Sequence, residues 1–375
     1  WVSWGHCSDG QDLVVSDPQW LQAVEQVCLT CCRLMGVERP PCGDQGYLFV
    51  LHLLDAGYGG LEHDHSSVLQ FSSRRLQKPD GRRQLLQLVA HEYLHQWNVR
   101  RLRPQELAPI DYHRPAVVPT LWFAEGVTSY YDLLLPLRAG LYDDTTFLAL
   151  LTKDLNRWFN TPGRQVQPLR ESSFDAWIKL YRRDAHSDNH QISYYLKGAM
   201  VALVVDLEIR ARHHNQRSFD DVLRSLWQEF GIPERGFTEA DVERAILAVG
   251  QWDADSELEF LERYHRYLDS TEELPLAMAL APFGLELVPL KPSLPFTGVT
   301  LRNTNGRISI GAVLSDSPGQ HAGLEPEDEL LAIDGMQANS AEEALSLIQN
   351  YLPGDTISFA VFHQNLLCLR LVTLG

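Results

Sequence analysis

Residues 85–98 place two histidines four positions apart in an apolar segment, and this stretch constrains the chain more than any other. His91 and His95 would share one face of a helix, because residues four apart are neighbours there. Glu92 directly follows the first histidine. A zinc ion bound by both imidazoles would lie within reach of that carboxylate, as a metal-activated water and its general base require. The alternative is a pair of surface histidines on an ordinary helix.

The same segment also predicts a helix with a core-facing side. Its apolar residues recur at spacings of four, four and three, which is typical of a buried helical stripe. The stripe consists of Leu86, Ala90, Leu94 and Trp97. A metal-binding face and a core face can therefore coexist on one helix.

A third ligand would distinguish a catalytic zinc site from the surface alternative, because such sites use three protein ligands and one open position. Glu125 lies in a second strongly helical segment, residues 121–131, after a loop rich in Arg and Pro. Its neighbours are mostly apolar, and a carboxylate in such a setting usually has a partner. We predict that Glu125 completes the site, against the alternative of a solvated helix charge.

Together these segments resemble the PDZ-bearing glycyl aminopeptidases, a branch of the gluzincin zinc metallopeptidases. The likeness is carried by residues 91–104 and 121–131, and by the motifs GGLEH at 59–63 and SYYLKG at 193–198, in the family's order. It implies an α+β fold, with a thermolysin-like catalytic domain of strands first and helices afterwards. One zinc ion per chain would be bound by His91, His95 and Glu125.

The resemblance also implies roles for residues outside the metal motif. In the family a glycine-rich strand edge pairs with the substrate backbone, and a glutamate binds its amino terminus; Gly59, Gly60 and Glu62 match these positions. Tyr195 matches the tyrosine that donates to the oxyanion, whereas the adjacent Tyr194 is expected in the core. A phenol suits that role because it donates without carrying a charge.

Local patterns suggest the element order and the domain boundaries. Residues 16–36 predict a helix that begins with a cap and proline and ends at a glycine. Strands are expected at 47–54 and 68–71, with Glu62 in the turn between them, and helices throughout 143–269, including capped starts at Ser218 and Thr238. We expect a remnant of an upstream β domain or a linker at 1–15 and the catalytic domain at 16–278.

The carboxyl-terminal part, residues 283–375, is similar to a PDZ domain, a mostly-β module. The similarity rests on residues 311–324 and 328–335. Such domains bind extended peptides at a sheet edge, with a loop of N–H groups for a terminal carboxylate, here residues 297–299. Glu327 replaces the usual glycine, so a remodelled turn is expected, and Thr297 is less apolar than usual. A fold that only braces the catalytic domain is the alternative.

Charge and composition exclude some partners. A formal net charge of −17 disfavours nucleic acid and anionic membranes, and no apolar run is long enough to span a bilayer. Cys28, Cys31 and Cys32 fit a helix core, while a disulfide between Cys7 and Cys42 stays open. We expect a reducing compartment, the cytoplasm; removal of a signal peptide upstream would instead imply the periplasm or secretion.

Three arginines follow the metal helix directly, at positions 100, 101 and 103. Cations there complement the carboxyl end of the helix dipole, so a solvated cluster is expected, with binding of a substrate carboxylate as the alternative. The function predicted for the chain is a zinc aminopeptidase that removes an amino-terminal glycine or other small residue, with Glu92 as base. A zinc endopeptidase and an inert peptide-binding scaffold are the alternatives.

Overall fold

The computed structural model describes residues 17–289 and 294–375. The described residues form two compact units. One comprises residues 17–156 and 194–261, and the other comprises residues 157–193, 262–289 and 294–375. The predicted remnant at residues 1–15, and Cys7 with it, lies outside the described residues. No helix among the described residues is long and apolar enough to cross a membrane.

A three-stranded sheet opens the first unit. Its strands are β1 (Leu48–Leu54), β2 (Tyr58–Glu62) and β3 (Ser66–Ser72). β3 lies in the middle, parallel to β1 and antiparallel to β2, so β2 is an edge strand. The sequence predicted a turn at Glu62, but Glu62 pairs with Ser67 as the last residue of β2. This short strand was not predicted because strands were identified by their β-branched residues, and glycine is rare in strands.

Helix α1 (Pro18–Met35) is built as its sequence predicts. Asp17 accepts a hydrogen bond from the Gln19 N–H at the amino end, and Gly36 ends the helix with a φ of 67°. A left-handed φ at this position suits glycine, which has no Cβ. Cys31 and Cys32 are buried, Cys28 is half-buried, and none of the three forms a disulfide.

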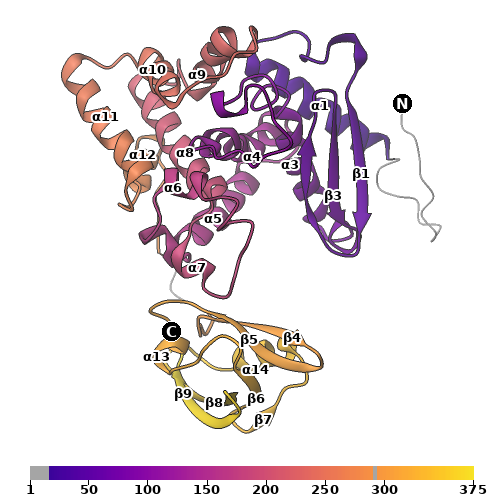
Figure 1. Cartoon of the computed structure of the whole chain (residues 1–375), viewed down its shortest axis with the longest axis vertical. Coiled ribbons are helices and arrows are strands. Elements are labelled where there is room, and N and C mark those ends of the chain that lie inside the picture. The colour runs from indigo at the N-terminus through magenta and orange to yellow at the C-terminus, as the bar shows by residue number, and fades with distance from the viewer. Residues whose placement is uncertain (1–16, 290–293) are drawn as a thin grey trace. The chain divides into compact units, whose positions relative to one another are not determined.

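Helix α3 (Gly81–Leu94) carries the histidines and packs against α1, α4, β2 and β3 (Figure 1). Leu86, Ala90, Leu94 and Trp97 are all buried, which confirms the predicted stripe. Because this side of α3 is buried, the residues on its other side are held in fixed positions. The metal-binding face therefore rests on a rigid element rather than on a loop.

A π-helical turn, η4 (Trp122–Val127), precedes helix α4 (Thr128–Arg138) and carries Glu125. It crosses helix α8 (Tyr194–Arg212) at two glycines. A Cβ added to Gly126 would stand 2.5 Å from the Gly198 Cα, and one added to Gly198 would stand 3.0 Å from the Gly126 Cα. Only glycine at both positions permits this approach of the two backbones.

The other helices of the described chain follow mainly in its second half. They are α2 (Ser73–Leu76), α5 (Asp144–Phe159), α6 (Leu169–Phe174), α7 (Ser187–His190), α9 (Phe219–Leu226), α10 (Glu239–Gly250), α11 (Ala254–Asp269), α12 (Leu276–Leu280), α13 (Pro318–His321) and α14 (Ala341–Ile348). Ser218 and Thr238 form capping boxes at the starts of α9 and α10, as predicted.

The helical prediction for residues 143–269 is wrong at residues 175–186, which form turns. Asp184 accepts a hydrogen bond from the His186 N–H at 2.9 Å, and the Ser187 hydroxyl accepts one from the Asp184 N–H at 2.9 Å. Such local bonds give the backbone an alternative to helical pairing.

The second unit contains an antiparallel sheet with strand order β4-β5-β6-β8-β9, and β7 pairs with β6. The strands are β4 (Val299–Thr304), β5 (Arg307–Val313), β6 (Glu329–Ile333), β7 (Met336–Gln337), β8 (Thr356–His363) and β9 (Leu366–Thr373). Apolar residues of β5, β6, β8 and α14 form its core. β4 is an edge strand.

The turn before β6 differs from its prediction. A remodelled turn was expected because Glu327 replaces glycine, yet Glu327 takes the glycine-like conformation, with a φ of 72°. Its N–H donates to the Ile310 carbonyl at 2.8 Å, and its carboxylate pairs with Arg302. Left-handed backbone at a residue other than glycine costs about 1 kcal/mol, and these bonds help to offset that cost.

Candidate metal centre

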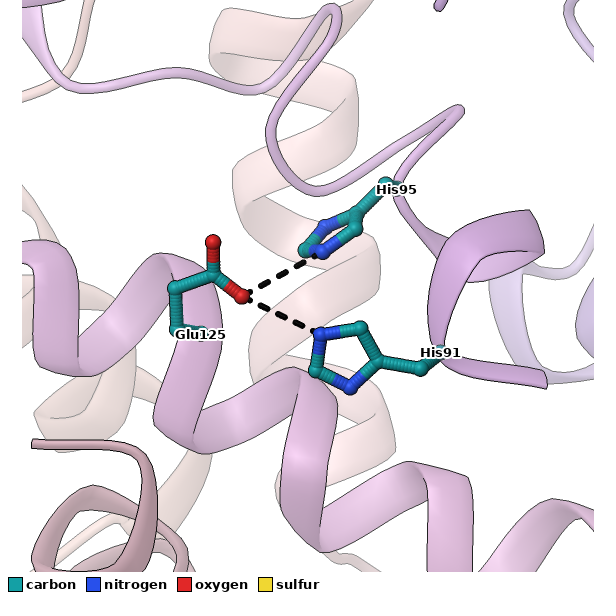
Figure 2. Close-up of side chains that lie close together, drawn as sticks. All are labelled: His91, His95 and Glu125. Carbon is teal, nitrogen blue, oxygen red and sulfur yellow. Dashed lines mark hydrogen bonds and ion pairs between the residues drawn. The ribbon is translucent and has the colours of Figure 1, made fainter. Parts of the chain in front are cut away.

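The three predicted ligands lie together in the first unit. His91 Nε2 and His95 Nε2 both point at one oxygen of Glu125, at 3.1 and 3.3 Å (Figure 2). The histidines come from α3 and its carboxyl end, and the glutamate from η4. Two imidazoles and one carboxylate are a donor set that zinc takes at catalytic sites.

Each histidine is oriented through its other nitrogen. His91 Nδ1 lies 3.0 Å from Asp132 Oδ2, and His95 Nδ1 lies 2.6 Å from the Asn98 carbonyl oxygen. A carbonyl can only accept, so Nδ1 of neutral His95 must carry the hydrogen and Nε2 keeps its lone pair. These partners hold both Nε2 atoms toward the same point, as is usual around a bound metal.

Asp132 was missed in the sequence. It follows Glu125 by two helical turns, so both carboxylates lie on the same helical face, and that spacing was the available signal. Asn98 was also missed as an orienting residue. Its carbonyl binds His95, and its side-chain amide donates to the Phe123 and Ala124 carbonyls at 3.2 and 3.1 Å. Asn98 thus ties the end of α3 to η4.

Charge in this cluster is strongly coupled. Burial opposes protonation of His95, but the Glu125 carboxylate outweighs it and raises the pKa of His95 to about 9. Burial likewise opposes protonation of His91, yet Asp132 and Glu125 raise its pKa well above the usual range. For Glu125, burial acts upward, and the two histidines lower its pKa far below the usual range. The protonated imidazoles of His91 and His95 therefore supply the positive charge that a bound cation would supply.

Glu92 is buried beside this cluster. Burial raises the pKa of its carboxyl to about 7, against the opposing effect of His95 and His91. Its Oε2 has no hydrogen-bond partner within the described residues. A buried carboxylate oxygen without a partner is costly unless a ligand or water satisfies it, so Glu92 is suited to accept a proton from a bound molecule.

Gly60 lies directly against Glu92. A Cβ built on Gly60 would stand 2.3 Å from Glu92 Cδ and 2.4 Å from Oε1, so any side chain at this position would displace the Glu92 carboxylate. Gly59 precedes it on the edge strand β2, whose outer side has no strand partner among the described residues. Both glycines are thus placed where a strand edge meets the candidate base.

Glu62, at the end of the same strand, reaches the cluster as well. Donor atoms of Glu62, Glu92 and His95 lie within 4.8 Å of one another, as do those of His91, His95 and Glu125. The two groups share His95, whose Nδ1 is engaged by Asn98. A metal bound by the second group therefore leaves Glu62 and Glu92 available for substrate and protons.

Tyr195 lies in the first turn of α8, half-buried, with its ring stacked beside that of His91 at a centroid distance of 6.2 Å. Tyr194 is 1% exposed and belongs to the core, as expected. Of the two adjacent tyrosines, only Tyr195 is thus placed beside a ligand and partly accessible.

Comparison with known families agrees with this geometry. Residues 84–201 match the model of the M61 glycyl aminopeptidase family, and residues 295–367 match that of the PDZ domain. The chain carries an M61 glycyl aminopeptidase domain and a PDZ domain. The first match spans the candidate ligands, Glu92 and Tyr195, and the second spans the β4–β8 strands.

A solved structure of an aminopeptidase has a similar fold. A crystal structure of an aminopeptidase N family protein from Idiomarina loihiensis is 28% identical, with a TM-score of 0.84, and the alignment covers 96% of this chain. It covers 63% of the other chain, so this sequence spans less than two thirds of that relative. The mixed helical and sheet fold of the chain is accordingly aminopeptidase-like.

Other likenesses are limited to fragments. An HtrA-type protease with a bound decapeptide is 19% identical over 26% of the chain, and a serine endoprotease from Yersinia pestis is 22% identical over 22%, with TM-scores of 0.22 and 0.20. No curated protein matches the chain significantly.

Proposed function

We propose that this protein is a zinc-dependent aminopeptidase that removes one amino-terminal residue, preferably glycine or another small residue, from peptides. The observation that carries the proposal is the position of Glu62. Its carboxylate lies beside Glu92 and His95 at the end of a glycine-containing edge strand. No hydrogen bond or ion pair engages that carboxylate within the described chain, so it is available for a substrate ammonium group.

The cluster of His91, His95 and Glu125 would hold the zinc. Its donor set fits this metal, and the outer partners Asp132 and Asn98 keep both Nε2 atoms directed inward. When bound there, zinc would polarise the scissile carbonyl and lower the pKa of water at its open position.

The remaining steps belong to the protein. Glu92 would take a proton from the attacking water and later give it to the leaving amine, which a carboxyl with a pKa of about 7 can do in both directions. Tyr195 would donate a hydrogen bond to the oxyanion. The edges of Gly59 and Gly60 would pair with the substrate backbone, and Glu62 would bind its amino group.

The preference for glycine is supported by the family alone, because no described residue visibly blocks a larger side chain. For the PDZ domain, we propose binding of extended peptides along β4. Carboxylate capture is less favoured, since the Val299 N–H in the candidate loop donates to the Thr297 hydroxyl at 3.3 Å. One donor of that loop is thus already used.

The test uses the whole zinc-loaded chain with Gly-, Ala- and Leu-amides and the peptide Gly-Ala-Ala, each with a free and an acetylated amino terminus. We expect hydrolysis of the free substrates, at least about 100-fold slower hydrolysis of the acetylated ones, and loss of both with a chelator. Interior cleavage of acetylated peptides at the same rate would identify an endopeptidase. Absence of hydrolysis at full zinc occupancy would identify an inert scaffold.

A further inference from the structure

The three arginines after the metal helix do not form the solvated cluster that the sequence predicted. The side chain of Arg100 is only 12% exposed, and its Nε donates to Asp64 Oδ1 at 2.8 Å. Arg101 donates to the Gln96 carbonyl at 3.0 Å, and Arg103 donates to the Arg100 carbonyl. All three arginines therefore make contacts near the end of α3, and Arg100 also forms an ion pair with Asp64, which is distant in sequence.

Asp64 lies two residues after Glu62, in the turn that joins β2 to β3. The His63 N–H donates to the Ser66 carbonyl at 2.7 Å and closes this turn. On the other side of the ion pair, the backbone N–H of Arg100 donates to the His95 carbonyl at 2.9 Å. The Asp64–Arg100 salt bridge, beside a weaker hydrogen bond from Arg101 Nη2 to the Asp64 carbonyl at 3.5 Å, therefore connects the turn that follows Glu62 with the residue that carries a metal-binding imidazole.

This connection matters because β2 pairs with another strand on one side only. It is hydrogen-bonded to β3, while its other edge has no strand partner among the described residues. Glu62 is its last residue, where an edge strand is least restrained. Without a second attachment, the carboxylate of Glu62 could move relative to the ligands on α3.

We propose that the Asp64–Arg100 ion pair is a positioning device that fixes the separation between Glu62 and the metal-binding cluster. The inference rests on the proposed aminopeptidase function. A fixed separation allows one residue between the bound amino group and the scissile bond, so the pair would be a determinant of exopeptidase specificity. Asp64 and Arg100 touch no substrate in this scheme, and they act through Glu62.

The electrostatics support the pairing. A hydrogen bond from Arg100 is the main cause that lowers the pKa of Asp64 below its usual range, so Asp64 is ionised at neutral pH.

The experiment measures peptide binding in a Glu92→Gln background, loaded with zinc, so that no turnover interferes. The probes are Gly-Ala-Ala and N-acetyl-Gly-Ala-Ala, titrated by calorimetry. The variants are Asp64→Asn, Glu62→Gln and both together, with Arg100→Lys as a second way to weaken the pair. Asp44→Asn is the matched control, because Asp44 forms an exposed ion pair with Arg39 at 3.0 Å.

We expect Asp64→Asn to weaken binding of the free peptide about three- to fivefold and to leave binding of the acetylated peptide unchanged. Arg100→Lys should act in the same direction and less strongly, because lysine keeps the charge and loses the planar fork. Asp44→Asn should change neither. In the Glu62→Gln background Asp64→Asn should have no further effect, since it acts through Glu62.

Three outcomes would overturn the inference. Equal weakening of both peptides, or a full effect of Asp64→Asn without Glu62, would make the ion pair a general structural support. An unchanged affinity in both Asp64→Asn and Arg100→Lys would deny any role. A parent protein that binds both peptides equally would instead refute the amine anchor, and with it the proposed function on which this inference rests.

Discussion

The backbone of Gly60 packs directly against the carboxylate of Glu92. A Cβ built on Gly60 would stand only 2.3 Å from Glu92 Cδ. Edge strand and candidate base thus occupy adjoining space. A substrate paired with β2 would run past the carboxylate that is proposed to accept the proton of the attacking water.

Gly60→Ala should lower kcat/KM about 100-fold with zinc content unchanged, because the added methyl group displaces Glu92 by a large fraction of an ångström or more. Metal analysis and steady-state kinetics on the same preparation measure both. Leu61→Ala is the control, since the Leu61 side chain on the same strand is 58% exposed. Equal losses in the two variants would mean that the strand, and not the contact with Glu92, is responsible.

Glu92→Gln should retain zinc and lose turnover by about 10²–10⁴-fold, because the amide keeps the shape and cannot accept the proton. In the zinc-loaded parent, kcat/KM should fall as the pH decreases through the pKa of Glu92. Burial raises that pKa to about 7 in the metal-free chain, and the bound cation lowers it, so the fall should lie below pH 7. A variant as active as the parent at saturating zinc would contradict the role of Glu92.

Tyr195→Phe should lower kcat by about 10²–10³-fold and barely change KM, because it removes a donor that acts mainly on the oxyanion. Tyr194→Phe is the matched comparison: the neighbouring ring is buried and stacks on Tyr195 with centroids 4.7 Å apart. An equal fall in kcat for Tyr194→Phe would show that the wrong tyrosine was chosen.

Zinc binding should release protons at pH 7. His95 has a pKa of about 9 in the metal-free cluster and the pKa of His91 is raised as well, so both imidazoles carry protons that the metal must displace. Zinc affinity should therefore fall as the pH decreases. Calorimetry in two buffers with different ionisation enthalpies measures the number released. Identical heats in both buffers would contradict a protonated cluster.

The sequence predicted those parts of the molecule that depend on neighbours along the chain. Helix α1 with Asp17 and Gly36, the capping boxes at Ser218 and Thr238, and the common face of His91 and His95 all follow from spacing within one helix. The approach of Glu125 needed a fold and was predicted only because catalytic zinc requires a third ligand. Glu62 and Tyr195 could be assigned roles through the family resemblance alone.

What the sequence did not predict depends on contacts distant in the chain. The orienting bond between His91 and Asp132 and the ion pair between Asp64 and Arg100 join different elements. The only local signal was the spacing of Asp132 two helical turns after Glu125, and the ion pair had none. Glu327 was misjudged for a different reason. A glycine-like turn was assumed to need glycine, whereas backbone bonds can hold another residue in the left-handed region at a modest cost.

The close crossing of Gly126 and Gly198 separates two properties that a motif search would treat as one. Binding of a metal would need α3 and η4, whereas the proposed oxyanion donor comes from α8, and at this glycine contact the backbones of η4 and α8 come close together. A relative with a larger residue at either position must move the two segments apart. It could keep both histidines and the glutamate, and still present its tyrosine too far away. Such a protein would bind zinc without hydrolysing peptides, and a search for its intact HExxH motif would wrongly identify it as an active peptidase.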